Sequence, residues 1–347
     1  MTGWREKLIM ENNIKYNVQF VKLCDMLSLG EIKREPKTIT GGLMNRMYSI
    51  ETTKGKFAVK ALNPSVMARP EAVKNYIISE HVANVAYKYV PALPAKMFNG
   101  NSLIYLEKQY YLIFDWIDGI TLKNYETSIE HCKIMGSILA KIHNIDFSNL
   151  GLVNEFTGDD TLIDWNYYLT RGKESKATWT KELINEIDIL YIWHEKVIKA
   201  SKIIDLSAVI SHGDLEPKNV IWHMNDPIII DWEAAGYINP QFDLLETAVY
   251  WSMNKTGNLN KDRFLSFLEG YKKEGKCFKI DWNIVLDKGF QGKLWWLEYS
   301  LKRSLWIDCT DTKEQQMGSE HVIATIEELN NYANIVPTIL SWLENKS

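Results

Sequence analysis

Three oxygen-bearing side chains, Asp214, Asn219 and Asp231, stand at a spacing that could carry out phosphoryl transfer. Asp214 and Asn219 lie five residues apart in the run HGDLEPKN at 212–219, and Asp231 follows after a short apolar run. Phosphoryl transfer needs a carboxylate to accept or orient the acceptor's hydroxyl proton, and hard oxygen donors to hold Mg²⁺. We therefore expect Asp214 to be the base, and Asn219 and Asp231 to be metal ligands. A lone Asp or Asn is more often a turn or helix cap, so the inference depends on the three together.

A lysine and a glycine turn further upstream could hold the phosphates of a nucleoside triphosphate. Lys60 ends a strand-like Phe-Ala-Val-Lys run, where the phosphate-contacting lysine of kinases stands. Glu80, on the helix expected next, is the residue we expect to form an ion pair with it. Gly41 and Gly42, followed by Asn45, would let the backbone approach a phosphate, although a plain hairpin turn explains these glycines nearly as well.

The periodicity of apolar residues divides the chain into a strand-rich part and a helical part. The expected elements are a helix over 5–29, strands between 37 and 62, a helix over 71–88, a hairpin ending at 110–115, helices over 129–142, 181–201 and 285–306, and a short strand at 228–230. The predicted fold class is therefore α+β, with a small antiparallel-sheet lobe and a large, mainly helical lobe. We place the N-terminal nucleotide-binding lobe at 1–116 and the C-terminal lobe, with the catalytic loop and acceptor site, at 117–347.

The bulk composition excludes several other classes of protein. With 347 residues, of which 46% are hydrophobic and 24% charged, the chain fits a soluble protein of two lobes. Its net charge of −4 gives no indication of nucleic-acid binding, and no apolar run approaches the ~18 residues of a membrane span. The start of the chain lacks the apolar stretch of a signal peptide. Four scattered cysteines suggest neither a zinc site nor disulfides, so we expect a cytoplasmic protein.

The motifs together resemble the aminoglycoside phosphotransferase family. This family belongs to a superfamily of protein-kinase-like bilobal fold that also includes choline, homoserine and methylthioribose kinases. The resemblance covers about residues 38–250 and is carried by GGLxNR at 41–46, WIDG at 116–119, LAxIH at 139–143, HGDLxxxN at 212–219, IDWExAG at 230–236 and PxxDL at 240–244. Gly213 favours the aminoglycoside branch, because choline kinases usually have Asn there. The signatures of a protein-kinase activation loop are missing, which argues against protein substrates.

The resemblance implies an activity and further roles at the site. The activity would be transfer of the γ-phosphate of ATP or GTP, with Mg²⁺, to a hydroxyl of a small polar and cationic molecule. The backbone at Asp115 and Ile117 would bind the purine. His212 would anchor the catalytic loop, and Asp243 would brace it from the start of a helix. Glu233 could either reach a second metal ion or play a structural role.

The acceptor would then lie over Asp214, against the helical segments at 155–205 and 285–306. These segments are rich in aromatic residues, most of which we expect in the core because they recur at helical spacing. The candidates for acceptor contacts are acidic groups for ammonium binding and aromatic groups for cation–π contact, namely Asp164, Glu246, Glu298, Trp295 and Tyr299. An aminoglycoside needs several carboxylates and choline needs an aromatic cage, and the sequence offers both.

Three functions remain open from the sequence. The first is an aminoglycoside-type O-phosphotransferase, acting as a monomer or homodimer in either antibiotic resistance or metabolism. The second is a choline- or ethanolamine-like metabolic kinase. The third is a catalytically silent, kinase-fold binding protein. The presence of Lys60, Asp214, Asn219 and Asp231 argues against the silent alternative, because degenerate members commonly lose at least one of these.

Overall fold

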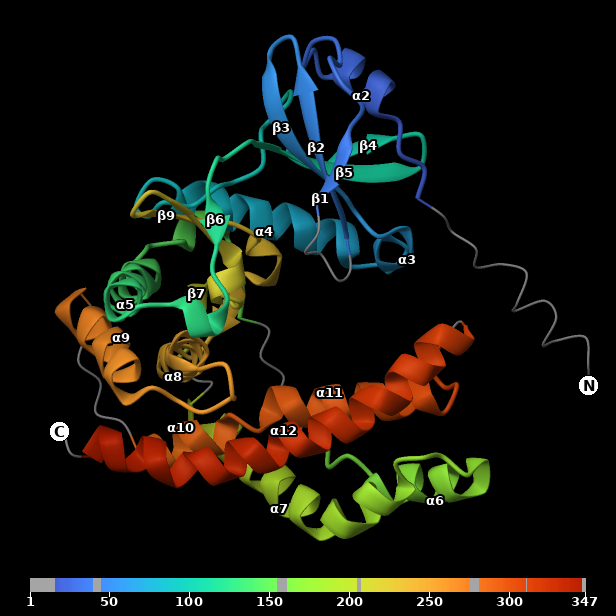
Figure 1. Cartoon of the computed structure of the whole chain (residues 1–347), viewed down its shortest axis with the longest axis vertical. Helices are drawn as coiled ribbons and strands as arrows, with labels where there is room; N and C mark the ends of the chain where they lie inside the picture. The colour runs from blue at the N-terminus through green and yellow to red at the C-terminus, as the bar shows by residue number, and fades with distance from the viewer. Residues whose placement is uncertain are drawn as a thin grey trace, which may run out of the picture.

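The computed structural model of the chain describes residues 16–39, 45–154, 161–204, 207–274, 281–309 and 311–344. A small lobe built on a sheet sits above a larger helical lobe, as Figure 1 shows with the blue and teal elements at the top. The predicted α+β class, with a small antiparallel sheet followed by helices, is confirmed. The lobe boundary at 116/117 stays a prediction.

The small lobe contains a five-stranded antiparallel sheet in the order β1-β2-β3-β5-β4. Alternation along β3 buries Val59 on one face of this sheet, in a cluster with Leu23 of α2. Leu62 and Leu112 belong to a second cluster that includes Tyr76 of α4. Lys60 therefore points away from the α2 side. The strands and helices of this lobe are α2 (Phe20–Met26), β1 (Lys37–Ile39), β2 (Arg46–Thr52), β3 (Gly55–Ala61), α3 (Pro64–Met67), α4 (Ala72–Ala86), β4 (Ile104–Leu106) and β5 (Gln109–Asp115).

The N-terminal helix is shorter than predicted in the part of the segment that the structure describes. The expectation was a helix over 5–29, but residues 16–19 are not helical and α2 begins at Phe20. Tyr111 of β5 explains the difference, because its hydroxyl donates to Asn17 O (3.1 Å) and accepts from Gln19 N (3.0 Å). The backbone of this segment is thus bonded to the sheet. The rest of the predicted helix, residues 5–15, lies outside the described residues.

The helical lobe combines packed helices with two short sheets. Helices α5, α8 and α9 share one hydrophobic core with β8 and β9. The three-stranded sheet has the order β6-β8-β9, and β7 pairs with β10. These elements are β6 (Ile120–Thr121), η1 (Asn124–Glu126), α5 (Ile129–His143), η2 (Ser148–Leu150), β7 (Val209–Ser211), η4 (Pro217–Asn219), β8 (Val220–His223), β9 (Asp226–Ile229), η5 (Trp232–Ala234), β10 (Gly236–Ile238), α8 (Pro240–Ser252) and α9 (Lys261–Glu274).

The helical lobe also contains a set of helices, which we call the lower helical layer, at its lower side in Figure 1. Most of the layer's buried aromatic and aliphatic residues form a core of their own, whereas Val285, Leu286, Ile339 and Leu343 belong to the core shared by α5, α8 and α9. The layer consists of α6 (Trp165–Ser175), α7 (Thr180–Ile204), α10 (Trp282–Lys288), α11 (Gln291–Ser304) and α12 (Thr312–Glu344). Helices of 129–142 and 181–201 are confirmed as α5 and α7.

The helix predicted over 285–306 is wrong, because two helices, α10 and α11, occupy this stretch. They are separated at Gly289, where a side chain would collide with the Tyr332 hydroxyl of α12. The same hydroxyl donates to Leu286 O at 2.8 Å, at the last turn of α10. The break thus follows from a contact with a distant helix.

Among the described helices, none combines the length and the apolar character needed to cross a membrane.

Candidate active site

An ion-pair cluster joins the small lobe to the helical lobe, and it contains two of the predicted site residues. Lys60 Nζ on β3 lies 2.7 Å from Asp231 Oδ1 and 2.8 Å from Glu233 Oε2 of η5. Burial alone would lower the pKa of Lys60, but the two carboxylates raise it above its ordinary value. The buried ammonium is therefore charged, and it stands beside a predicted metal ligand.

The backbone after α4 helps to bring the two lobes together at this point. Ile229 N donates to Pro91 O, and Leu93 N donates to Ile229 O, both at 2.8 Å. The segment leaving the small-lobe helix is thus paired with the end of β9. Since Asp231 follows β9 by two residues, this pairing places its carboxylate under the sheet that carries Lys60.

Glu233 is the centre of a hydrogen-bond network between the lobes. Its Oε2 accepts from Lys60 Nζ, from Asn45 Nδ2 (3.1 Å) and from the Tyr76 hydroxyl (3.2 Å). Asn45 Oδ1 also accepts from Asn63 N (2.9 Å), which fixes the start of β2. Burial and Glu233 raise the pKa of Tyr76 to about 12. In this structure Glu233 therefore links β2, β3 and α4 to η5.

Glu80 is not the partner of Lys60, contrary to the expectation from the sequence. Its Oε2 accepts from Ala95 N at 2.7 Å, and the residue is 4% exposed. The ammonium of Lys60 is already occupied by Asp231 and Glu233, which approach from the helical lobe. Burial raises the pKa of Glu80 to about 7, although Ala95 N–H and Lys60 act in the opposite direction.

We expect the Glu80→Gln variant to keep its stability at higher pH better than the wild type. Because the folded-state pKa of Glu80 is about 7 and its ordinary value is 4.5, the folded state holds this proton more tightly. The associated stability is present below pH 4.5 and is lost as pH rises through 7. This proton can contribute at most about 3 kcal/mol to the free energy of unfolding. Gln keeps an acceptor for Ala95 N–H.

Urea unfolding at pH 5 and pH 8 tests this expectation. The difference between the two free energies of unfolding should be smaller in Glu80→Gln than in the wild type. Glu71→Gln is the matched control, because Glu71 lies at the start of the same helix with an exposed side chain. An equal difference in all three proteins would contradict the prediction.

The catalytic loop is anchored by hydrogen bonds of the buried His212 and by close packing at Gly213. His212 Nε2 donates to Ile230 O (3.0 Å) and its Nδ1 accepts from Asp214 N (3.2 Å), which assigns the neutral tautomer. Burial lowers the pKa of His212, in agreement with that tautomer. Gly213 has φ +75°, and a side chain there would collide with Ala234 O. The predicted anchoring role of His212 thus has a direct geometric basis.

The predicted base and one predicted metal ligand lie in contact. Asn219 Nδ2 donates to Asp214 O (2.8 Å) and to Asp214 Oδ2 (2.9 Å). Ile230 N donates to Asn219 O (2.9 Å), so the residue before Asp231 is held next to this loop. Asp231 itself adopts the left-handed conformation with φ +63°, a strained position of the kind that clusters at functional sites. The local backbone therefore brings Asp214, Asn219 and Asp231 together.

The oxygen atoms of these residues fit Mg²⁺. In the described part of the chain, Asn219 Oδ1 and Asp231 Oδ2 accept no hydrogen bond, because the partners of these side chains use the other atoms. Carboxylate and amide oxygens are the hard donors that Mg²⁺ prefers, and it is usually held by one or two of them together with substrate phosphates. The described ranges contain no group of three or more His, Cys, Asp and Glu side chains that could hold a metal ion.

Asp243 lies at the start of α8, as predicted, but its hydrogen bonds are not those expected. Its carboxylate accepts from His143 Nε2 (2.8 Å), whose Nδ1 contacts the Tyr271 hydroxyl (2.8 Å). No hydrogen bond links the Asp243 side chain to the catalytic loop within the residues described. Trp251 holds that loop instead, since its Nε1 donates to Leu215 O at 2.8 Å. Asp243 thus joins α8 to α5 and α9.

The predicted hinge lies at the end of β5. Trp116 N donates to Lys56 O, so the alternating pattern directs the N–H and C=O of Asp115 away from β3. The side chain of Asp115 forms an ion pair with Lys96 at 2.7 Å. The N–H of Ile117 has no hydrogen-bond partner among the residues that are described. These backbone groups are thus available to a purine. The glycine turn at Gly41 and Gly42 lies outside the described residues.

One predicted acceptor residue, Glu246 on α8, lies near the catalytic loop. Burial raises the pKa of Glu246 to about 7; Lys293 lowers it, and the charges of Asp214 and Glu216 add to the rise. Tyr250, one turn further along α8, also has a raised pKa, from burial and then from Glu246, Glu216 and Asp214. The charge of the predicted base thus acts on both Glu246 and Tyr250 of α8.

The other predicted acceptor residues lie on the lower helical layer. Asp164 caps α6 by accepting from Tyr167 N (3.0 Å), and α6 packs on α7, below α11 and α12 in Figure 1. Glu298 accepts from the Tyr168 hydroxyl (2.8 Å) and pairs with Lys302 (2.9 Å). The structure does not bring Asp164 to the catalytic loop.

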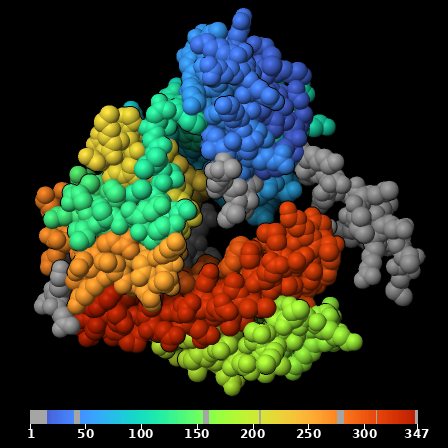
Figure 2. Space-filling view, viewed as in Figure 1, coloured from blue at the N-terminus to red at the C-terminus, as the bar shows by residue number. Residues whose placement is uncertain are grey.

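Two aromatic candidates on α11 are partly or largely exposed. Trp295 is 56% exposed. The centroid of the Tyr299 ring lies 5.4 Å from that of the Trp296 ring and 5.5 Å from the Arg303 guanidinium. A cation of the protein thus already faces Tyr299. Figure 2 shows the face of the molecule hollowed between the small lobe, the α8–α9 region and α11.

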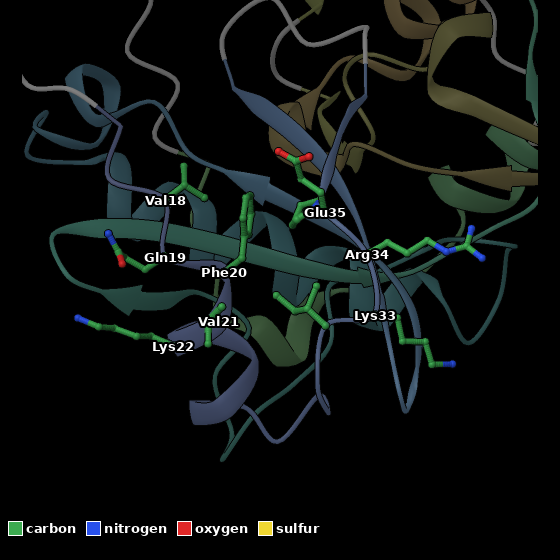
Figure 3. A pocket seen from close by; sticks show the side chains of 10 residues that line it. Val18, Gln19, Phe20, Val21, Lys22, Lys33, Arg34 and Glu35 are labelled. Atoms are coloured by element: carbon green, nitrogen blue, oxygen red, sulfur yellow. The ribbon is translucent and has the colours of Figure 1, made fainter.

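A hollow of about 740 Å³ on the small lobe lies apart from this site. It is lined by residues 18–22 and 32–36, and the lysines and the arginine labelled in Figure 3 point away from it. Ile32 bridges to Thr52, at the end of β2 opposite Asn45. The hollow therefore has neither the position nor the charged lining of a phosphate site.

Sequence reasoning missed several residues of the site. Tyr76 lies one turn before Glu80 on α4, so helical spacing from the predicted glutamate could have identified it. Trp251 and Tyr250 follow Glu246 on α8 by about one turn, which is a similar signal. No pattern in the sequence indicated a role for Glu216. In the structure, its carboxylate lies 3.3 Å from the ammonium of the neighbouring Lys218.

Comparisons with known proteins agree with this geometry. A model of the phosphotransferase enzyme family matches residues 35–275. A spectinomycin phosphotransferase, solved with ADP and spectinomycin, has a TM-score of 0.67 at 13% identity, over 92% of this chain and 99% of that one. For an amicoumacin kinase solved with AMP-PNP and Ca²⁺, the TM-score is 0.60 at 10% identity, over 94% and 96% of the chains. The ethanolamine kinase of Plasmodium vivax gives 0.52 at 16% identity, over 85% and 83%.

A search of curated proteins finds no match to the sequence. At such low identities the likeness to solved structures shows the fold, which is the protein-kinase-like bilobal one. The family model, in contrast, covers most of the chain and contains Lys60, Asp214 and Asp231. The chain therefore belongs to the phosphotransferase enzyme family.

Proposed function

We propose that the protein transfers the γ-phosphate of a magnesium-bound nucleoside triphosphate, ATP or GTP, to a hydroxyl of a small cationic molecule of aminoglycoside type. The observation that carries this proposal is the 2.7 Å ion pair between Lys60 and Asp231, beside the loop that holds Asp214 against Asn219. A phosphate-binding cation, oxygen donors for a metal and a carboxylate base are the parts that phosphoryl transfer requires.

Each part has a defined task in this proposal. Bound Mg²⁺ and nucleotide supply the phosphoryl group and neutralise charge on its oxygens. Lys60 holds the phosphates, while Asn219 and Asp231 provide oxygen atoms to the metal. The backbone of Asp115 and Ile117 binds the purine. Asp214 accepts or orients the acceptor's hydroxyl proton.

The acidic surroundings of Asp214 support a cationic acceptor. Glu246 adds a carboxyl group whose pKa is raised to about 7 by burial and by the charges of Asp214 and Glu216, so a bound ammonium would favour its ionised form. A negatively charged cleft attracts ammonium groups and favours them over neutral alcohols. A choline- or ethanolamine-like kinase is the second candidate, supported by the neighbouring rings of Trp296 and Tyr299 on α11.

A nucleotide-consumption screen tests the proposed function. ATP and GTP would each be combined with spectinomycin, other aminoglycosides, choline, ethanolamine, homoserine and methylthioribose, in Mg²⁺ and in EDTA. Acceptor-dependent ADP or GDP release in Mg²⁺ would support the proposal. Preference for choline would favour the second candidate. Nucleotide binding without transfer to any acceptor would favour the silent alternative and overturn the proposal.

Salt should weaken the binding of a polycationic acceptor. Because the site is open to solvent on the acceptor side, ions shorten the range of the attraction between ammonium groups and carboxylates. We expect the KM of an accepted aminoglycoside to rise several-fold between 50 mM and 500 mM NaCl, while the KM for the nucleotide, measured as the control, changes less. A flat response of the acceptor's KM would contradict the acidic site.

A further inference from the structure

The turn η4 brings a lysine of the chain against the predicted base. Lys218 Nζ lies 3.3 Å from Glu216 Oε2 and 3.6 Å from Asp214 Oδ2. Pro217 and Asn219, the residues on either side of Lys218, are buried, whereas the Lys218 side chain is 59% exposed. The chain thus places one ammonium of its own between two carboxylates at the acceptor side of the site.

The two oxygens of Asp214 are used differently. Oδ2 accepts from Asn219 Nδ2 and faces the Lys218 ammonium, whereas no N–H group or ammonium of the described residues donates to Oδ1. Oδ1 is therefore the atom that an acceptor hydroxyl can reach. A base must lie within about 2.6–3.2 Å of the oxygen whose proton it takes.

From this arrangement we infer that Glu216 is a specificity residue that binds an ammonium on the carbon next to the reacting hydroxyl, in the place that Lys218 occupies in the free protein. The inference rests on the proposed function and names its substrate class as vicinal amino alcohols. In such a compound a gauche ammonium lies about 3 Å from the hydroxyl oxygen. The hydroxyl can then meet Asp214 Oδ1 while the ammonium meets Glu216 and Asp214 Oδ2.

The displacement of Lys218 costs little. The Lys218 side chain is 59% exposed, so solvent screens the charge of its ammonium and the released side chain regains its freedom. An incoming ammonium, in contrast, is held close to the site by the hydroxyl on the adjacent carbon. Glu216 is the more buried partner, with 20% of its side chain exposed, and it is therefore the better anchor.

Simple amino alcohols test the inference. The probes are trans-2-aminocyclohexanol, 3-aminocyclohexanol and cyclohexane-1,2-diol, which differ in the position or presence of the ammonium. We expect the wild type to phosphorylate the vicinal compound with a kcat/KM at least about tenfold above that of the other two, the factor expected for one charge-assisted contact. Similar values for the diol and the vicinal compound would overturn the inference.

Two variants with opposite expected effects sharpen the test. Glu216→Gln should raise the KM for the vicinal compound about tenfold, with a smaller change in kcat, and should change the KM for the diol much less. Lys218→Met should lower that KM, by up to about fivefold, because the internal competitor is gone. A fall in kcat with every acceptor in Lys218→Met would show that Lys218 acts on the transferred phosphate, which would overturn the inference.

Matched controls come from an exposed Lys–Glu ion pair on α7, away from the site. Lys199 and Glu195 on α7 are four residues apart and 3.7 Å from each other, so Lys199→Met and Glu195→Gln remove equivalent charges elsewhere. Neither should change the preference among the probes. If the wild type phosphorylates a screened acceptor but does not phosphorylate the vicinal amino alcohol among the probes, the inference fails while the proposed function stands. Absence of transfer to any acceptor would be the failure of the proposed function.

Discussion

Replacing Asp214 with Asn should lower the rate of phosphoryl transfer by about two to four orders of magnitude, the usual contribution of a general base. Asn has the shape of Asp and can still accept from Asn219 Nδ2 (2.9 Å in the wild type), so the loop should keep its conformation. The nucleotide contacts lie on other elements, with Lys60 on β3 and Asp231 after β9. We therefore expect the dissociation constant of the nucleotide to change little.

Single-turnover rates and nucleotide titrations of the same preparation separate these two effects. Asp226→Asn is the matched control, because Asp226 is an exposed Asp at the start of the neighbouring strand β9. Turnover close to that of the wild type would remove Asp214 from the role of base. A parallel loss of nucleotide affinity would mean that the substitution disturbed the site as a whole.

Replacing Asp231 with Asn should weaken nucleotide binding by at least about tenfold when Mg²⁺ is present, since losing even an outer-sphere partner of a metal costs that much. In EDTA the loss should be much smaller, because Lys60 still has Glu233 at 2.8 Å and remains buried and charged. Transfer activity should fall with the metal affinity. The expected signature is therefore a variant whose nucleotide affinity depends much less on Mg²⁺ than that of the wild type.

Glu233→Gln is the informative comparison for this experiment. Glu233 Oε2 accepts from Lys60, Asn45 and Tyr76, so its loss should displace the lysine and weaken nucleotide binding with or without Mg²⁺. A loss confined to Mg²⁺ conditions would instead place Glu233 at a second metal ion. An unchanged affinity of Asp231→Asn in Mg²⁺ would contradict the assignment of Asp231 as a metal ligand.

Several parts of the site were predictable from the sequence because they depend on short-range geometry. Asp214 and Asn219 meet within one loop and its 3₁₀ turn, and Asp231 follows the hairpin that starts from that turn. Alternation along β3 was sufficient to direct Lys60 away from the side of Val59. The α5 and α7 helices followed from their apolar spacing.

The partner of Lys60 could not be predicted in this way. Glu80 and Glu233 are both carboxylates whose charges act on this lysine. Which of them contacts the Lys60 ammonium depends on where η5 meets the small lobe. It also depends on Ala95, because its N–H donates a hydrogen bond to the Glu80 carboxylate. These are contacts between segments far apart in the chain, and no local pattern encodes them.

The amino-acid sequence alone determined the fold class, the family resemblance and the grouping of Asp214, Asn219 and Asp231, because residue spacing and periodicity act over a few residues. Only the tertiary structure decided that Tyr111 excludes residues 16–19 from the N-terminal helix and that Tyr332 separates α10 from α11. It also decided that Lys60 pairs with Glu233, because packing between distant elements selects one carboxylate among chemically equal candidates.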